Sequence, residues 1–236
     1  ADALGDMLYI LCGTILEHGM QHKIEEVFNE IQQSNMSKLG EDGKPILLGW
    51  MNNWAYANHT FETPFRGRMT LPRQLSLVAE GQALVARSEP IPSMPSIEIK
   101  QGETPLPEIG ENDLAILKLE TEINQGESAQ IVFKSSSKEV IVLRYCSIDD
   151  EFTLDRTAAT PADVPDISSS IFRFPRISRK VTVDATICLS KGGIEFYLDD
   201  GVQSATMLFD PHQKIETIDY NCRNKCREDI ARAANR

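Results

Sequence analysis

The spacing of the apolar residues changes near Pro45, and this change most constrains what the chain can fold into. Before it, apolar residues recur every three or four positions, as they do along one face of a helix. One stripe consists of Leu4, Met7, Leu8, Leu11 and Ile15, and a second of Ile24, Val27, Phe28 and Ile31. We therefore expect two packed antiparallel helices of about 16 and 11 residues. Gly19 should end the first helix, and GEDGKP at 40–45 should form a turn.

From residue 46 onward, apolar residues alternate with polar ones, and β-branched and aromatic residues dominate. This period of two predicts β-strands, separated by turn sequences such as NQGES, SKGG and LDDGVQ. The expected strands are 46–50, 69–78, 115–123, 129–134, 140–147, 169–174, 179–189, 193–198 and 205–209. Many short strands without intervening helices indicate a mainly β protein, built as a sandwich or a barrel.

Two further stretches carry weaker signals. The proline-rich SEPIPSMP at 88–95 predicts a crossing between two β units. Residues 221–236 contain five basic and two acidic side chains, which predicts a solvated basic tail or a short helix. The helical part is too small to bury a good core alone, so it packs either on the β part or on partners outside this chain.

The charge of the chain excludes some classes of partner. Its 236 residues include 24 basic and 35 acidic side chains, a formal net charge of −11. Such a chain has no broad nucleic-acid surface, because phosphate binding needs clustered lysine and arginine. No apolar run approaches the ~20 residues that a membrane span requires, and no signal peptide is visible. We expect a cytoplasmic protein without a nucleic-acid or membrane partner.

The five cysteines are scattered and odd in number, which indicates mostly free thiols and a reducing compartment. Cys12 and Cys188 lie in apolar segments and are expected as small core residues. Cys222 and Cys226 are four residues apart and could meet on one helix face. A metal site there would need a second Cys or His pair, and none is nearby.

Three motifs of the β part resemble glycoside hydrolase family 32, which contains the invertases, levanases, inulinases and sucrose-6-phosphate hydrolases. GWMNNWAYAN at 49–58, followed by TPFRGRMTLPRQLSL at 63–77, resembles a late segment of the family's β-propeller. FTLDRTAA at 152–159 and GGIEFYLDDGVQSATMLFDP at 192–211 resemble a strand and the last hairpin of its C-terminal β-sandwich. The resemblance implies late propeller strands at 46–87, a β-sandwich at 88–220 and a basic tail at 221–236.

This resemblance also implies a sugar site. Asn53 and Trp54 correspond to a loop that borders the family's substrate pocket, where amides satisfy hydroxyls and aromatic faces cover apolar CH patches. A role in the propeller core or in closing a turn is an equal alternative for both residues. The implied partner is a fructoside or fructan, and the reaction uses no cofactor.

The family's catalytic motifs do not occur in this chain. The family retains configuration with an Asp nucleophile and a Glu acid, two carboxylates about 5–5.5 Å apart. They lie in W-[ML]-N-D-P-N-G and E-C motifs, with an R-D-P motif between them, and none of the three is present. Met51-Asn52-Asn53 has Asn where the nucleophile would be. We therefore expect no hydrolysis of fructosides by this chain alone.

The first 46 residues resemble a second family, the MazG-like and phosphoribosyl-ATP pyrophosphohydrolases. ADALGDMLYILCGT and EEVFNEIQQSNMSKLGEDGKPI carry this resemblance. It implies a helical hairpin at 1–45 in which Asp2 and Asp6 approach a Mg²⁺, while Asn35 and Lys38 contact phosphate. The two aspartates equally suit an exposed helix start, where the helix dipole favours acids. The family's E-E-x-x-E helix is absent from this sequence.

Three hypotheses follow for the function. The first is a β-fructosidase region that is inactive alone, and the second is a fragment of a Mg²⁺-dependent nucleoside triphosphate pyrophosphohydrolase. The third is a non-catalytic carbohydrate-binding or interaction module. Because the two resembled families share no chemistry, the junction at 44–47 also suggests a recombination chimera, a degenerate fusion or an engineered chain. An exposed sheet edge would favour self-association.

Overall fold

The computed structural model describes residues 2–36, 39–40, 42–52, 67–91, 94–136, 138–159 and 171–226. The chain divides into two compact units, Ala1–Ile46 and Leu47–Arg236. The described residues are mainly β, as the period-two pattern predicts. No helix among them is long and apolar enough to cross a membrane.

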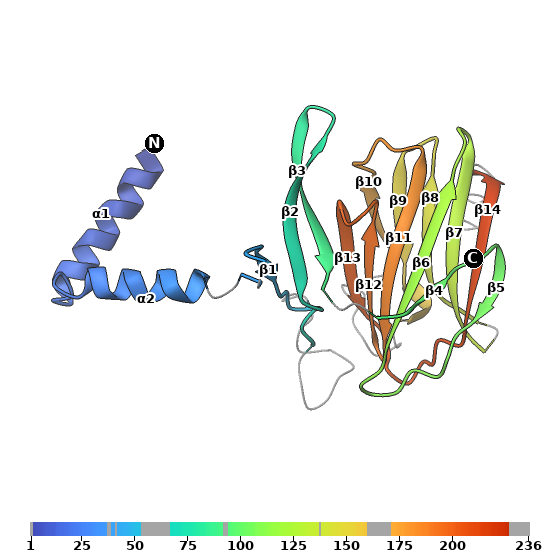
Figure 1. Ribbon diagram of the computed structural model, residues 1–236, viewed down its shortest axis with the longest axis horizontal. Helices are drawn as coiled ribbons and strands as arrows, with labels where there is room; N and C mark the ends of the chain where they lie inside the picture. Colours follow the sequence, from blue (N-terminus) through green and yellow to red (C-terminus); the bar gives the residue numbers. More distant parts are fainter. Residues whose placement is uncertain are drawn as a thin grey trace. The chain divides into compact units, whose positions relative to one another are not determined.

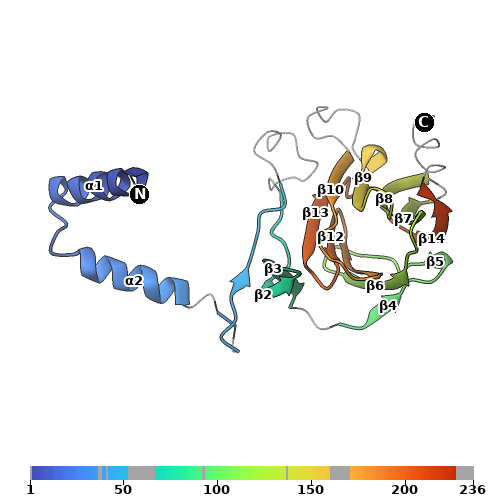
Figure 2. The same cartoon turned by 90° about the horizontal axis from the view of Figure 1, so that it is seen from above.

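The first unit contains α1 (Asp2–Glu17) and α2 (Ile24–Met36). Gly19 follows α1 with a φ of 62°, and its N–H donates to Leu16 O, as expected for a helix stop. Figures 1 and 2 show the two helices diverging from their connecting turn. The predicted packed pair is therefore wrong: Leu11 and Phe28, one from each apolar stripe, are 55% and 61% exposed.

The second unit contains a sandwich of two sheets, which face each other in Figures 1 and 2. The six-stranded sheet has the order β10-β9-β8-β7-β14-β5 and the five-stranded sheet the order β13-β12-β11-β6-β4. The first comprises β5 (Gly102–Pro105), β7 (Glu127–Ser135), β8 (Lys138–Cys146), β9 (Glu151–Asp155), β10 (Ile171–Pro175) and β14 (Thr217–Lys225). The second comprises β4 (Ser96–Glu98), β6 (Leu114–Glu122), β11 (Thr182–Ser190), β12 (Gly193–Leu198) and β13 (Gln203–Leu208). A 3-10 turn, η2 (Thr157–Ala159), follows β9.

The core lies between the two sheets because each strand turns alternate apolar residues inward. Leu117, Ile187 and Phe196 come from one sheet, and Phe133 and Ile141 come from the other; all five are fully buried. The rings of Phe133 and Phe196 meet edge to face across the sandwich, with centroids 6.0 Å apart. These contacts join the two sheets into one sandwich.

A hairpin lies beside the sandwich. It consists of β2 (Arg73–Glu80) and β3 (Ala83–Pro90), paired antiparallel with Leu77 opposite Ala86. The short β1 (Ile46–Leu47) spans the boundary between the two units. Pro72 immediately precedes β2, where a residue without an N–H donor is tolerated. The proline-rich 88–95 does not form a simple crossing, since it contributes the end of β3.

The C-terminal residues correct two predictions. Residues 217–225 form β14 between β7 and β5, so 221–225 are neither a solvated tail nor a helix. Cys226, which follows β14, forms a disulfide with Cys146 at a Cα–Cα distance of 5.6 Å. The predicted free thiols are therefore wrong for this pair, and the strand removes the helix face on which Cys222 and Cys226 would have met. Cys12, expected in a core, is exposed.

Candidate functional site

The predicted site residues lie largely outside what the structure describes. Asn53, Trp54 and Lys38 fall outside the described residues. Asp2 and Asp6 lie on α1 and Asn35 lies on α2, but their side chains are also outside the description. The segments on either side of 53–66, residues 49–52 and 67–70, are described.

These flanking segments form a short ladder, which we call the stem (residues 49–52 and 67–70). Trp50 and Met69 form an antiparallel bridge. On either side of it, Met51 N donates to Arg68 O at 2.7 Å and Thr70 N donates to Gly49 O at 2.8 Å. The stem therefore brings Asn52 and Gly67 next to each other.

Gly67 sets the tight packing of the stem. Its φ is 93°, which only glycine adopts readily. A Cβ at this position would lie 2.8 Å from Trp50 Nε1 and 2.9 Å from Asn52 Cβ. Glycine is therefore required here both by the backbone conformation and by the approach of the indole.

The stem is anchored by buried groups. Thr70 is buried, and its hydroxyl accepts a hydrogen bond from Gly49 N at 2.9 Å. Met51 is also buried, and its Cε lies 3.5 Å from the position that a Cβ on Gly193 would occupy. Gly193 is the first residue of β12, so the stem contacts the sandwich directly.

A buried carboxylate adjoins the stem. Glu195 lies on β12, is 4% exposed and accepts three hydrogen bonds. Its Oε1 accepts from Leu71 N at 2.7 Å, and its Oε2 accepts from Arg73 Nη2 and from the Tyr197 hydroxyl, both at 2.8 Å. The Arg73 guanidinium lies over the Tyr197 ring, 5.2 Å from its centroid. Leu71 N and Arg73 Nη2 come from residues 71–73, at the start of the β2–β3 hairpin, which we call the hairpin side. The Tyr197 hydroxyl comes from the sandwich.

The chemistry of this cluster is structural, because its hydroxyl and thiol groups stay protonated at neutral pH. Burial and the neighbouring Glu195 raise the pKa of the Tyr197 hydroxyl far above its usual range. Burial also raises the pKa of the nearby Cys188 thiol to about 12, so this thiol stays protonated at neutral pH. The cluster can hold two segments together but supplies no activated nucleophile.

A second contact joins β3 to the sandwich at the turn after β12. Asp199 and Asp200 have positive φ values, and Ser88 N donates to Gly201 O at 2.9 Å. A Cβ on Gly201 would lie 2.1 Å from Ser88 O, so this approach requires glycine. Arg176 holds the turn through a bidentate pair with the fully buried Asp199, with both N–O distances 2.7 Å.

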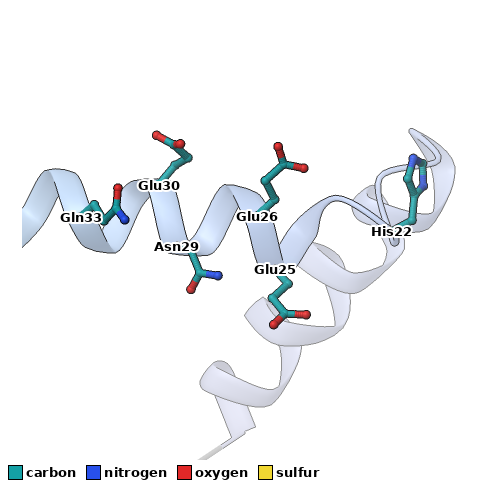
Figure 3. Close-up of a pocket in the computed structure, with 6 residues that line it drawn as sticks. All are labelled: His22, Glu25, Glu26, Asn29, Glu30 and Gln33. Atoms are coloured by element: carbon teal, nitrogen blue, oxygen red, sulfur yellow. The ribbon is translucent and has the colours of Figure 1, made fainter.

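The helical unit has a shallow hollow on α2, shown in Figure 3. It is lined by His22, Glu25, Glu26, Asn29, Glu30 and Gln33. Glu26 and Glu30 point to one side of the helix and Glu25 to the other, so the acids do not converge. No group of three His, Cys, Asp or Glu side chains in the described ranges could hold a metal ion.

A larger hollow of about 620 Å³ lies at one end of the sandwich. Its rim comes from residues 106–111, 189–191, 209 and 211–216. Two exposed ion pairs cross this rim, Lys214 with Glu108 and Lys191 with Glu111. Because both rim lysines are paired with acids, the rim presents no free ammonium group to an anionic ligand.

The Arg73–Glu195 pair was missed by the sequence reasoning, although a signal existed. Glu195 stands between Ile194 and Phe196 in a strand whose six residues are all buried. An acid that stays buried in such a strand needs a cationic or N–H partner. The sequence does not identify that partner, because Arg73 lies 122 residues away.

Comparison with known proteins relates the β part to one enzyme family. The family model for the glycosyl hydrolases family 32 N-terminal domain matches residues 24–88. A levanase of Bacillus sp. (strain L7) is 22% identical over 173 residues, which cover 68% of this chain and 19% of the levanase. The chain therefore spans about a fifth of the length of this curated relative.

Solved structures of related enzymes share the fold. The exo-inulinase from Aspergillus awamori has a TM-score of 0.55 at 17% identity and covers 77% of this chain and 38% of its own. The β-fructofuranosidase from Schwanniomyces occidentalis, complexed with fructosyl-erythritol, has a TM-score of 0.55 at 13% identity and covers 76% and 42%.

Together these findings support a relationship to glycoside hydrolase family 32. They do not support the MazG-like resemblance or the chimera hypothesis. The family match also begins at residue 24, the first residue of α2, and so overlaps the segment assigned to that second family.

Proposed function

We propose that this chain acts as part of a β-fructosidase, an enzyme that hydrolyses the O-glycosyl bonds of sucrose or fructan. The matched residues 24–88 include the stem and the segment 53–66 that it carries. The curated relative is a levanase, and the structural neighbours include an exo-inulinase and a β-fructofuranosidase. No cofactor is needed for this chemistry.

Within such an enzyme, we propose that the second unit holds the stem in place. The observation that carries this assignment is that Met51 of the stem contacts the sandwich, as do Leu71 and Arg73, which follow the stem. Asn53 and Trp54, in the segment between the two sides of the stem, would contact the fructosyl group. The β-sandwich then extends to Cys226 rather than ending near residue 220, because β14 pairs with both β5 and β7.

The chain alone should bind fructosides without hydrolysing them. Retaining hydrolysis needs a nucleophilic carboxylate and an acid about 5–5.5 Å apart, and the motifs that carry both are absent from this sequence. A purely carbohydrate-binding module would also bind fructosides without hydrolysing them.

The test uses the purified 236-residue chain with sucrose, inulin and levan. Fructose release is measured enzymatically, and binding of a fructo-oligosaccharide is measured by calorimetry. We expect no release above buffer, together with binding that Trp54→Ala weakens at least tenfold. Fructose release would overturn the proposed inactivity, and an absence of binding would overturn the assignment of Asn53 and Trp54. Mg²⁺-dependent release of pyrophosphate from a nucleotide would favour the MazG-like alternative instead.

A further inference from the structure

We infer that Glu195 is a positioning residue through which the β-sandwich fixes the stem. This inference rests on the proposed function for its consequence on sugar binding. That Glu195 fixes the stem is argued from the contacts of Glu195 and does not depend on the proposed function. Glu195 would not touch the sugar, since it is 4% exposed and acts through the backbone of the hairpin side.

The first step is that the Glu195 carboxylate joins two segments distant in sequence. Both oxygens are used: Oε1 accepts from Leu71 N and Oε2 accepts from Arg73 Nη2. Arg73 and Glu195 are both nearly fully buried, with side chains 8% and 6% exposed. Charge-assisted hydrogen bonds that are shielded from water hold geometry more firmly than exposed ones.

The second step links this contact to the stem. Leu71 directly follows Thr70, whose N–H and hydroxyl are both bonded to Gly49. Fixing the backbone at Leu71 therefore fixes the register of 67–70 against 49–52. A shift at Leu71 therefore changes how Asn52 and Gly67, the inner ends of the stem, lie against each other.

The third step is that a carboxylate is required rather than any polar side chain. All three groups that face Glu195 are donors, namely Leu71 N, Arg73 Nη2 and the Tyr197 hydroxyl. A glutamine would have to turn its NH₂ group toward one of these donors in either orientation. One link to the hairpin side would then be lost, and Arg73 would remain buried without its anion.

The experiment uses tryptophan fluorescence, because Trp50 and Trp54 are the only tryptophans in the chain. In a Trp54→Phe background, Trp50 alone reports on the stem. We expect Glu195→Gln to shift Trp50 emission to the red and to raise acrylamide quenching at least twofold. Hydrogen exchange at Met51 N and Thr70 N should accelerate at least tenfold. With Trp54 present, fructo-oligosaccharide affinity should fall at least fivefold.

Two controls separate positioning from loss of stability. Tyr197→Phe removes one donor to Glu195 but keeps both links to the hairpin side. Ile141→Ala weakens the core on β8, in the opposite sheet, without touching the network. Both should lower the melting temperature while leaving Trp50 emission and quenching unchanged. If Glu195→Gln lowers the melting temperature too far for these measurements, Arg73→Lys gives the same readout in a milder form.

The outcomes divide cleanly. Unchanged Trp50 emission in Glu195→Gln, or an equal change in Ile141→Ala at the same loss of melting temperature, would overturn the positioning role. A change in Trp50 emission and quenching that is confined to Glu195→Gln and Arg73→Lys would establish the positioning role. An unaltered chain that binds no fructo-oligosaccharide would instead refute the proposed function, and the Trp50 readout would still decide the role of Glu195.

Discussion

At the scale of single residues, Glu195 shows how the surroundings decide what an acidic side chain does. Its neighbours Ile194 and Phe196 are part of the sandwich core, so alternation along β12 turns Glu195 to the outer face of the sheet. On an open face this carboxylate would be solvated. Here Leu71 and Arg73 cover it and supply the donors that compensate for its burial.

Gly67 allows a direct test of how tightly the stem is packed. Gly67→Ala should lower the free energy of unfolding by about 2–4 kcal/mol, because it adds a steric conflict with Trp50 to the strain of a positive φ. Gly126→Ala is the matched control, since Gly126 has a φ of 90° and open space around it. It should lower that free energy by only about 1 kcal/mol. If urea unfolding shows the same loss of free energy of unfolding in both variants, the close approach of the Trp50 indole does not add to the cost of Gly67→Ala.

Asp184 makes stability depend on pH in a direction that can be derived. Burial, supported by the charges of Asp200 and Asp199, raises the pKa of its carboxyl, although Asp200 N donates to it. The folded chain then holds this proton more tightly than the unfolded chain. Asp184 therefore reduces the free energy of unfolding as the pH rises above about 4, the ordinary carboxyl pKa, and through the higher pKa of the folded chain.

Replacing this carboxylate by an amide should remove that dependence. Asp184→Asn keeps an oxygen that can accept from Asp200 N, and should raise the free energy of unfolding at pH 7 by less than about 1 kcal/mol, since the site is partly exposed. The gain should disappear near pH 3, where wild-type Asp184 is protonated. Urea unfolding at both pH values measures the difference, and a loss of stability at pH 7 would mean that the charge strengthens the bond to Asp200.

At the scale of elements, apolar alternation predicted several strands but missed β3, β9 and β14. The stretches 115–123, 140–147 and 193–198 correspond closely to β6, β8 and β12. Ile218, Tyr220 and Cys222 of β14 alternate toward the core, but the strand was missed because the basic composition of 221–236 indicated a solvated tail or a short helix. The helix pairing failed for another reason: an amphipathic stripe predicts that a helix packs, but it does not identify what it packs on.

The disulfide after β14 should contribute much of the stability of the six-stranded sheet. Cys146 and Cys226 are separated by 80 residues. Closing a loop of this length lowers the conformational entropy of the unfolded chain, which raises its free energy by about 4 kcal/mol. Cys226→Ser should therefore lower the free energy of unfolding by roughly 2–4 kcal/mol. Cys222→Ser is the control and should change it by less than about 1 kcal/mol, because Cys222 is a free thiol. Reductant should bring the wild type to the level of Cys226→Ser in urea unfolding.

At the scale of the whole molecule, the sequence predicted the mainly β fold and the change near residue 46, but only part of the candidate site. The motif at 49–58 located the segment that carries Asn53 and Trp54. The groups that hold its stem, Glu195 and Gly193, lie on β12, far along the sequence, and their contact depends on how the hairpin meets the sandwich. Such long-range contacts are decided by packing rather than by local spacing.

The hairpin leads to a prediction about association. β3 is the last strand of its sheet, and Leu77 and Leu84 on the hairpin are 71% and 72% exposed. A terminal strand beside exposed apolar side chains favours pairing with another chain. We expect the purified chain to self-associate at micromolar concentrations, and Leu77→Lys with Leu84→Lys to shift it toward monomer.

Sedimentation velocity over a hundredfold range of concentration checks this expectation. The matched control is Val181→Lys, which replaces another exposed apolar residue, 72% exposed and outside the hairpin. Because it adds positive charge without altering the hairpin, it should leave the association unchanged. Equal dissociation by both sets of substitutions would mean that net charge, rather than the hairpin, governs the contact. A monomer at every concentration would show that the backbone edge of β3 and its leucines are insufficient to recruit a second chain.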